Sequence, residues 1–217
     1  AIERSLGPLH PRVASSLTNL ANLARDAGDY TTAWTLTQRA LTVREAANGP
    51  DHPGVARLHF NLAFLAQLRG DPAAARAGAE RALAIFERTL GPAHPDLSYP
   101  LNFLGVLAKD EGRLDDAEAL LRRSLTIDEA ALGPDNPELG SQLCNLGDVA
   151  LARGRLDEAR QHHARALALW EDAHGRVHPE LSYPLLGLAR TAHASHATAE
   201  ALALAERALA VTTGRAD

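Results

Sequence analysis

The chain of 217 residues is 46% hydrophobic and 23% charged, which is the balance of an ordinary globular protein, and no apolar run approaches the length of a membrane span. Its net charge of −5 at pH 7 gives no electrostatic reason to expect nucleic acid or a membrane surface as a partner. The single cysteine, Cys144, excludes an intrachain disulfide and suits the cytoplasmic location that we expect.

A six-residue loop recurs every 42 residues without insertion or deletion. It first stands at 6–11 as Leu-Gly-Pro-Leu-His-Pro and returns in varied form at 48–53, 90–95, 132–137 and 174–179. Repeats of this length are typical of solenoids, in which each unit buries its apolar face against its neighbours. We therefore predict one domain over 1–217 with five repeats, at about 8–49, 50–91, 92–133, 134–175 and 176–217. Residues 1–7 match the tail of a preceding unit, so we expect the chain to be a fragment of a longer protein.

The first repeat predicts two helices separated by a glycine turn. His10-Pro11 opens the first helix, because proline is favoured at the first helical position. Its apolar face comprises Leu17, Leu20, Ala21 and Ala24. Gly28-Asp29 then ends it, and a second helix is expected over 31–47 until Asn48-Gly49-Pro50 stops it.

The other repeats follow the same pattern position by position. The turn between the helices has Gly28, Gly70, Gly112 and Gly154, but His196 in the last repeat. Three register positions hold small residues: Ala24, Ala66, Ala108, Ala150 and Ala192; Ala33, Ala75, Ala117, Ala159 and Ala201; Ala40, Ala82, Ser124, Ala166 and Ala208. Small side chains at fixed points let paired helices approach closely. The fold class is therefore predicted as all-α, an α-solenoid of five helix-turn-helix units.

These residues resemble a known family. Gly28-Asp29-Tyr30, Ala33 and Arg39-Ala40-Leu41 are similar to the tetratricopeptide repeat, and the 42-residue unit with Asn19-Leu20-Ala21-Asn22-Leu23 resembles its kinesin light chain-type variant. Similar arrays occur in bacterial multidomain regulators, often attached to signalling NTPase domains. The resemblance implies a right-handed superhelix whose first helices line a concave groove, and a role in binding peptides or protein segments.

Two repeats depart from the pattern near their start. Pro100 and Pro184 each lie five residues after the opening proline, where a proline removes a backbone hydrogen bond. We therefore predict a separate short turn at 95–98 and at 179–182, with the main helix beginning near the second proline. The fifth repeat lacks the mid-repeat glycine and has Arg176 in place of the loop proline, so it is either a terminal cap or a drifted copy.

The sequence offers little for catalysis, and we predict no enzymatic activity, no cofactor and no metal. The loop histidines His10, His52, His94 and His178 recur one repeat apart, and the fourth copy is Asn136, so we interpret them as helix N-caps rather than metal ligands. The pairs His174 with His178, His162 with His163, and His193 with His196 could hold a metal only weakly, because no cysteine or carboxylate set completes a site. Cys144 has no evident base partner, and no phosphate-binding or nucleophile-elbow motif occurs.

The second helices carry regularly spaced charges of both signs. Arginines stand at Arg39, Arg81, Arg123, Arg165 and Arg207, and glutamates at Glu45, Glu87, Glu129 and Glu171. An arginine series alone would suggest nucleic acid. The matching glutamates favour a solvated face or ion pairs between repeats.

The remaining candidate site is the non-core side of each first helix, which the resemblance places in the groove. We name its candidate contact residues the groove stripe: Asn19, Asn22, Arg57, Phe60, Asn61, Phe64, Tyr99, Asn102, Phe103, Lys109, Asn145, Asp148, Tyr183 and Arg190. Five of the chain's nine aromatic residues, which are two Trp, three Tyr and four Phe, lie on it, although a merely solvated face should hold few. Alternatively, its phenylalanines only pack between neighbouring first helices.

Asparagine is the other feature of the stripe. Asn19, Asn61 and Asn145 share one register position, and an asparagine side chain offers both a donor and an acceptor to a peptide backbone. Asn102 lies one residue out of register. In similar repeats such asparagines hold the main chain of bound segments. The cations Arg57, Lys109 and Arg190 would favour some acidic character in the ligand.

Together these features predict a non-enzymatic interaction module that binds a peptide or protein segment, from another protein or from its own full-length chain. The main alternative is a sensor, autoinhibitory or self-associating arm of a larger signalling NTPase regulator. A third is an enzyme-accessory or metal-holding role.

Overall fold

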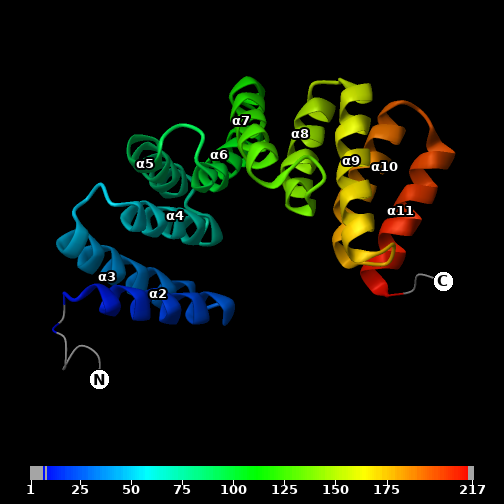
Figure 1. Ribbon diagram of the computed structural model, residues 1–217. Coiled ribbons are helices and arrows are strands. Elements are labelled where there is room, and N and C mark those ends of the chain that lie inside the picture. The colour runs from blue at the N-terminus through cyan, green and yellow to red at the C-terminus, as the bar shows by residue number, and fades with distance from the viewer. Residues whose placement is uncertain (1–6, 8, 215–217) are drawn as a thin grey trace. The chain divides into compact units, whose positions relative to one another are not determined.

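The computed structural model describes residues 7 and 9–214, and the repeats within them are α-helical (Figure 1). The predicted tail at 1–7 lies outside the described residues except for Gly7. The chain divides into two compact units, Ala1–Leu107 and Ala108–Asp217, and the boundary falls within one helix. We describe each unit by itself.

Unit 1 contains the first two repeats and the start of the third. Its elements are α2 (Pro11–Asp26), α3 (Tyr30–Asn48), α4 (Pro53–Leu68), α5 (Pro72–Leu90), the 3₁₀ turn η1 (Pro95–Leu97) and most of α6 (Ser98–Asp110). Helix α2 packs against α3, and α4 packs against α5. Helix α3 also packs against α4, so the first repeat contacts the second. The described helix α3 is one residue longer at each end than the predicted 31–47.

Unit 2 contains the rest of the array. Its elements after α6 are α7 (Leu114–Leu132), the 3₁₀ turn η2 (Pro137–Leu139), α8 (Gly140–Ala152), α9 (Leu156–His174), the 3₁₀ turn η3 (Pro179–Leu181), α10 (Ser182–Ala194) and α11 (Thr198–Thr213). Helix α8 packs against α9 and α10 against α11, while α7–α8 and α9–α10 contacts join successive repeats. The predicted helix-turn-helix architecture is confirmed.

The recurring loop residue caps the following element, as the sequence predicts. In every repeat its side chain accepts a hydrogen bond from the backbone N–H two residues later: Arg12 N to His10 Nδ1 at 3.2 Å, Gly54 N to His52 Nδ1 at 2.9 Å, Asp96 N to His94 Nδ1 at 3.1 Å, Glu138 N to Asn136 Oδ1 at 2.9 Å and Glu180 N to His178 Nδ1 at 3.4 Å. Because the first N–H groups of a helix have no acceptor within the helix, the cap satisfies one of them. This geometry confirms the capping role.

The turn between paired helices requires a left-handed residue. Gly28, Gly70, Gly112 and Gly154 have φ between 73° and 79°, a conformation that glycine adopts without steric cost. His196 takes the same place in the fifth repeat with φ of 62°, and it is the one non-glycine residue at positive φ among those described. The fifth repeat therefore keeps the turn but holds it with a strained residue.

The small residues lie where paired helices touch. Ala33, Ala75, Ala117 and Ala159 are fully buried, and so are Ala40, Ala82, Ser124 and Ala166. Larger apolar side chains fill the space between them, for example around Leu121 and Leu143 in unit 2. Ala24 and Ala201, in the first and last repeats, are only half-buried.

A short 3₁₀ turn precedes the first helix of repeats three, four and five. This confirms the predicted turns after Pro95 and Pro179, but the cause that we inferred from the second proline is wrong. Repeat four has the same turn although Gln142 replaces that proline. Pro100 is the third residue of α6, where a missing N–H costs no intrahelical bond. What these turns share is a fully buried leucine at Leu97, Leu139 or Leu181, where the first two repeats have valine.

Candidate functional site

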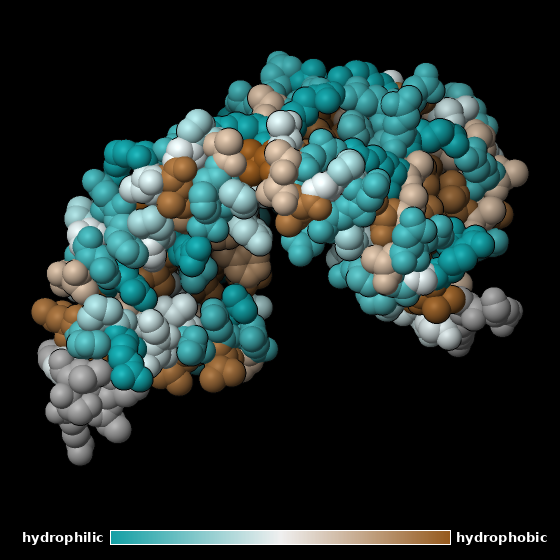
Figure 2. Space-filling view, viewed as in Figure 1, coloured by the Kyte–Doolittle hydropathy of each residue, from teal (hydrophilic) through white to brown (hydrophobic). Residues whose placement is uncertain are grey.

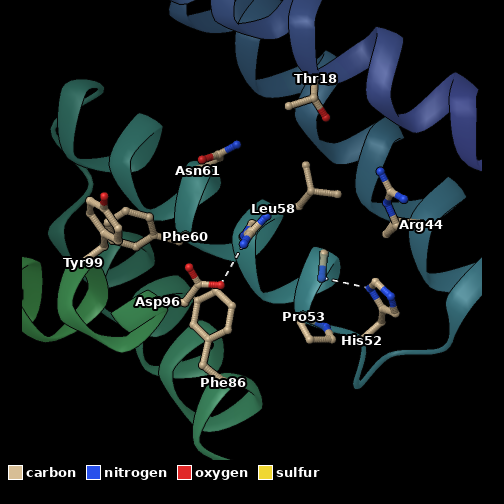
Figure 3. Close-up of a pocket in the computed structure, with 12 residues that line it drawn as sticks. Thr18, Arg44, His52, Pro53, Leu58, Phe60, Asn61, Phe86, Asp96 and Tyr99 are labelled. Carbon is tan, nitrogen blue, oxygen red and sulfur yellow. Dashed lines mark hydrogen bonds and ion pairs between the residues drawn. The ribbon is translucent and has the colours of Figure 1, made fainter. Parts of the chain in front are cut away.

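Unit 1 contains a cavity of about 560 Å³ beside the start of α4 (Figure 3). Its lining residues are Thr18, Arg44, His52, Pro53, Gly54, Arg57, Leu58, Phe60, Asn61, Phe86, Asp96 and Tyr99. Phe60 and Tyr99 lie on one side of this cavity, while Arg44 and His52 lie on the opposite side. The first-helix residues Arg57, Phe60, Asn61 and Tyr99 belong to the predicted groove stripe.

A second cavity of about 210 Å³ adjoins the first. It is lined by Ala21, Asn22, Arg25, Thr37, Phe60, Asn61, Phe64 and Leu65. Phe60 and Asn61 line both cavities, so these two neighbours on α4 form the wall between them. The structure thus brings together six groove-stripe residues in unit 1: Asn22, Arg57, Phe60, Asn61, Phe64 and Tyr99.

The aromatic residues of unit 1 combine both roles that the sequence left open. Phe60 and Phe103 meet edge to face, with ring centroids 5.6 Å apart, and both are half-buried between α4 and α6. Phe64 and Tyr99 are 40% and 63% exposed. One pair therefore stiffens neighbouring first helices, while the other two rings present apolar surface to solvent.

The asparagines differ in their surroundings. No hydrogen bond joins the Asn61 side chain to any residue that the structure describes, although this amide is half-buried between two cavities. Asn22 lines the smaller cavity, whereas Asn19 is exposed and lines neither. Asn102 and Asn145 are half-buried, and each has an interaction partner. Asn61 is therefore the half-buried asparagine of the series that lines both cavities and makes no hydrogen bond to the described residues.

The three cations assigned to an acidic ligand are already engaged with carboxylates. Arg57 lies 2.8 Å from the Asp96 carboxylate in unit 1. In unit 2, Lys109 and Arg190 both bind Asp148, at 3.5 and 2.5 Å. An acidic ligand would have to compete with these pairs, which weakens the electrostatic selection that the sequence suggested.

Three residues that line the large cavity are absent from the predicted groove stripe, because they lie outside the first helices. Arg44 on α3 donates to the Ser15 hydroxyl at 3.2 Å, its Nε is buried without a partner among the described residues, and no described carboxylate pairs with it. Phe86 lies on α5, and Asp96 lies in η1. Arg44 and Phe86 share one register position, and its residue type differs in every repeat, with Asp128, Trp170 and Thr212 in the others. This variation between repeats is the sequence feature that could have indicated Arg44 and Phe86 as candidates.

In unit 2 the groove stripe takes a different form. Gly187 holds the register position of Asn61, and a Cβ there would lie 2.4 Å from the His163 ring, so no asparagine fits. Tyr183 is 68% exposed and borders an open cavity of about 520 Å³. The other lining residues of this cavity are Leu186, Ala189, Arg190, His193, Ala201 and Ala205.

Cys144 behaves as a small apolar residue. It packs beside two buried apolar clusters of unit 2, and burial raises the pKa of its thiol to about 12. A thiol with such a pKa is not ionised at neutral pH, so it is a poor nucleophile.

Two of the three histidine pairs are engaged in other contacts. The rings of His174 and His178 stack with centroids 4.7 Å apart, and Nδ1 of His178 is occupied by its capping bond. His162 lies beside Glu158 at 3.6 Å, whereas His163 is fully buried elsewhere. Within the described part of the chain, no group of three or more His, Cys, Asp and Glu side chains is arranged to hold a metal ion.

Charged side chains of the second helices pair between repeats in unit 2. Arg165 binds Glu129 of the preceding repeat at 2.6 Å, and Arg207 binds Glu171 in the same way. This geometry confirms the inter-repeat ion pairs for these two arginines.

Hydrophilic residues cover much of the visible surface, with hydrophobic ones exposed between them (Figure 2). Among the described helices, none combines the length and apolarity needed to cross a bilayer.

The model of the tetratricopeptide repeat family matches the chain at residues 12–88, 56–130, 100–156 and 138–213. Among curated protein sequences, none matches this chain.

Several solved structures share the fold. BtubC (BKLC) from P. vanneervenii is similar with a TM-score of 0.82 at 23% identity, over 94% of this chain and 81% of that one. A putative kinesin light chain from Podosopora anserina with nearly identical TPR-like repeats gives 0.76 at 23% identity, over 94% and 97%. The Rap conjugation gene regulator of plasmid pLS20, solved in complex with the Phr* peptide, gives 0.69 at 18% identity, over 91% and 53%. The family match across nearly the whole chain, together with its helix pairs, shows that this chain belongs to the tetratricopeptide repeat family.

Proposed function

We propose that unit 1 binds an extended segment of a protein, from another chain or from its own full-length chain, across helix α4. Tetratricopeptide repeats generally mediate protein–protein interactions and are generally non-enzymatic scaffolds. In this proposal the segment places one apolar side chain in each of the two adjoining cavities. The protein acts by binding alone and carries out no chemical step.

The observation that carries this proposal is the position of Asn61. Its amide lies between the two cavities, and its hydrogen-bonding groups are unused by the described residues. A main-chain amide of a bound segment offers one donor and one acceptor, which this side chain can match whatever the segment's sequence. The segment gains affinity because the half-buried amide is shielded from water.

Apolar contacts supply the rest of the recognition. Leu58, Phe60 and Phe86 line the larger cavity, and Phe64 and Leu65 line the smaller one. Phe64 is 40% exposed, and aromatic side chains that a partner buries are where interfaces concentrate their binding energy. Tyr99 adds a ring that water reaches freely in the absence of a partner. In unit 2, Asn145 and Tyr183 remain proposed contacts of the same kind.

The test begins with a random peptide library displayed on phage and selected on the purified chain. The affinity of the selected peptides is then measured by fluorescence anisotropy for wild type, Asn61→Ala and Asn19→Ala. Loss of the amide contact should weaken binding by about tenfold, equivalent to about 1.4 kcal/mol. Asn19→Ala should bind like wild type, because Asn19 lies outside both cavities. Equal affinities for all three proteins, or a selection that yields no binding peptide, would refute the proposal.

A further inference from the structure

His163 on α9 is enclosed between two glycines. Its side chain is 1% exposed, and a Cβ on Gly147 of α8 or Gly187 of α10 would lie 2.6 or 2.4 Å from the ring. The ring therefore fills the space that both glycines leave open. The imidazole forms part of the contact between the fourth and fifth repeats.

The ring lacks the contacts that a charged imidazole needs. Neither Nδ1 nor Nε2 of His163 has a hydrogen-bond partner among the described residues. The nearest carboxylate is Asp148, 3.7 Å from Nε2, and it already binds Arg190 and Lys109. A buried imidazolium with two unsatisfied N–H groups is costly, so the packed junction accommodates only the neutral ring.

The charged and titratable groups around His163 come from all three helices of the junction. Asp148 of α8 favours protonation, whereas Arg190 of α10 and the neighbouring His162 of α9 oppose it. Burial is the largest influence, and together these effects lower the pKa of His163 to about 4. In an opened junction the ring would be hydrated and would titrate near the ordinary histidine value of about 6.5.

We propose that His163 is a proton-operated latch that holds the fourth and fifth repeats together when neutral and releases them when protonated. The proton comes from solvent and binds a ring nitrogen, which the closed junction cannot hydrate. Opening separates α10 from α9, so water reaches the ring. Because a group with a lowered folded-state pKa stabilises the closed form only while it is deprotonated, closure is favoured above about pH 6.5 and is lost progressively toward pH 4.

The chain contains its own reporter for this opening. Cys144 on α8 is the only cysteine, and it packs against a buried cluster that includes Trp170 of α9 and Leu185 of α10. Cys144 is part-buried in the closed form, so opening is followed as the pH-dependent increase in its reaction with 4,4′-dithiodipyridine, a disulfide that thiols attack in mild acid. The rate at each pH is divided by that of glutathione at the same pH, which removes the chemistry of the reagent itself.

In wild type, the normalised rate should rise by at least about tenfold between pH 7.5 and pH 5, because each pH unit below the pKa of the open form favours opening up to tenfold. His163→Leu and His163→Ala should abolish this rise, since neither side chain titrates. Both residues are compatible with the register, because Leu121 and Ala79 occupy the same position, fully buried, in earlier repeats. His162→Gln removes the adjacent histidine and should keep the rise.

Two results would overturn the latch. A flat normalised rate in wild type would show that the junction stays closed in acid. An undiminished rise in both His163 variants would assign the opening to another group. The measurement uses no ligand, so its outcome is independent of the proposed binding by unit 1.

Discussion

The indole of Trp170 on α9 lies against Gly140, the first residue of α8, so closely that a Cβ on Gly140 would be 2.3 Å from the indole nitrogen. The same nitrogen donates a hydrogen bond to the Pro137 carbonyl oxygen at 2.8 Å, which fixes the ring over the turn η2. The backbone of Gly140 has φ of −56°, which any residue can adopt. Glycine is therefore required at this position by the indole of Trp170 and not by the backbone conformation.

Gly140→Ala should therefore destabilise unit 2. Relief of the overlap requires the indole or α8 to shift, and overpacking of this kind costs about 1–3 kcal/mol. Urea unfolding followed by circular dichroism should show the loss. The second repeat has Ala56 and Phe86 at the positions of Gly140 and Trp170. Adding Trp170→Phe to Gly140→Ala should therefore restore much of the lost free energy of unfolding. A cost that is equal with and without Trp170→Phe would disprove the steric cause.

Substitution of a capping histidine should separate capping from other roles of the ring. His52→Ala removes the acceptor for the Gly54 N–H and should cost about 1 kcal/mol of unfolding free energy. His52→Asn should be nearly neutral, because Asn136 makes the equivalent bond in the fourth repeat. Thermal unfolding of the two variants provides the comparison. Equal destabilisation by both would mean that the ring, rather than its acceptor nitrogen, is needed.

His196→Gly should stabilise the fifth repeat. A histidine at φ of 62° is strained, and four earlier repeats have glycine at this turn. Relief of the strain exceeds the extra chain entropy of glycine, giving a net gain of roughly 0.5–1 kcal/mol. The midpoint of urea unfolding should rise, with an unchanged slope. A lower midpoint would show that the histidine side chain makes a contact worth more than the strain.

Glu118 joins several arginines on unit 2. Its carboxylate accepts from Arg155 at 2.6 Å and also contacts Arg122 and Arg153. The hydrogen bond from Arg155 is the main reason why the pKa of Glu118 falls to about 2. Because this pKa is lowered on folding, the stabilisation is present above about pH 4.5 and disappears as the pH falls toward 2.

Glu118→Gln should lower the free energy of unfolding at pH 7 by about 1 kcal/mol, a modest figure because water reaches the arginine partners. The difference from wild type should shrink in 1 M salt and at pH 3, as urea titrations would show. Glu80→Gln, at an exposed position without a described partner, is the matched control and should have little effect. A salt-independent loss would point to packing rather than charge.

Much of the fold could be predicted because each helix boundary repeats in phase. Pro53 favours a helix start through its fixed φ and its missing N–H group, and Gly28 ends a helix because it adopts a positive φ. Both effects are local, so the sequence alone predicts them. The 3₁₀ turns were expected for a wrong reason, because the buried Leu139 that accompanies them acts through the core, which a local pattern does not show.

The candidate site was less predictable. The helical period places Asn22, Phe60 and Asn61 on one face, and the structure gathers them around two cavities. The helical period in the sequence does not reveal that Arg44 reaches the same cavity from a second helix, α3. Nor does it reveal that Lys109 and Arg190 share Asp148, because those pairings depend on side-chain geometry between repeats.

If unit 1 binds as proposed, the shared wall of Phe60 and Asn61 also constrains how the ligand must be built. Once one of its side chains fills the larger cavity, the neighbouring side chain is held beside the smaller one at a high effective concentration, so two weak contacts act as one strong contact. The spacing of the two side chains would then matter more than the strength of either. Ligands with both groups but the wrong interval would bind no better than ligands with one.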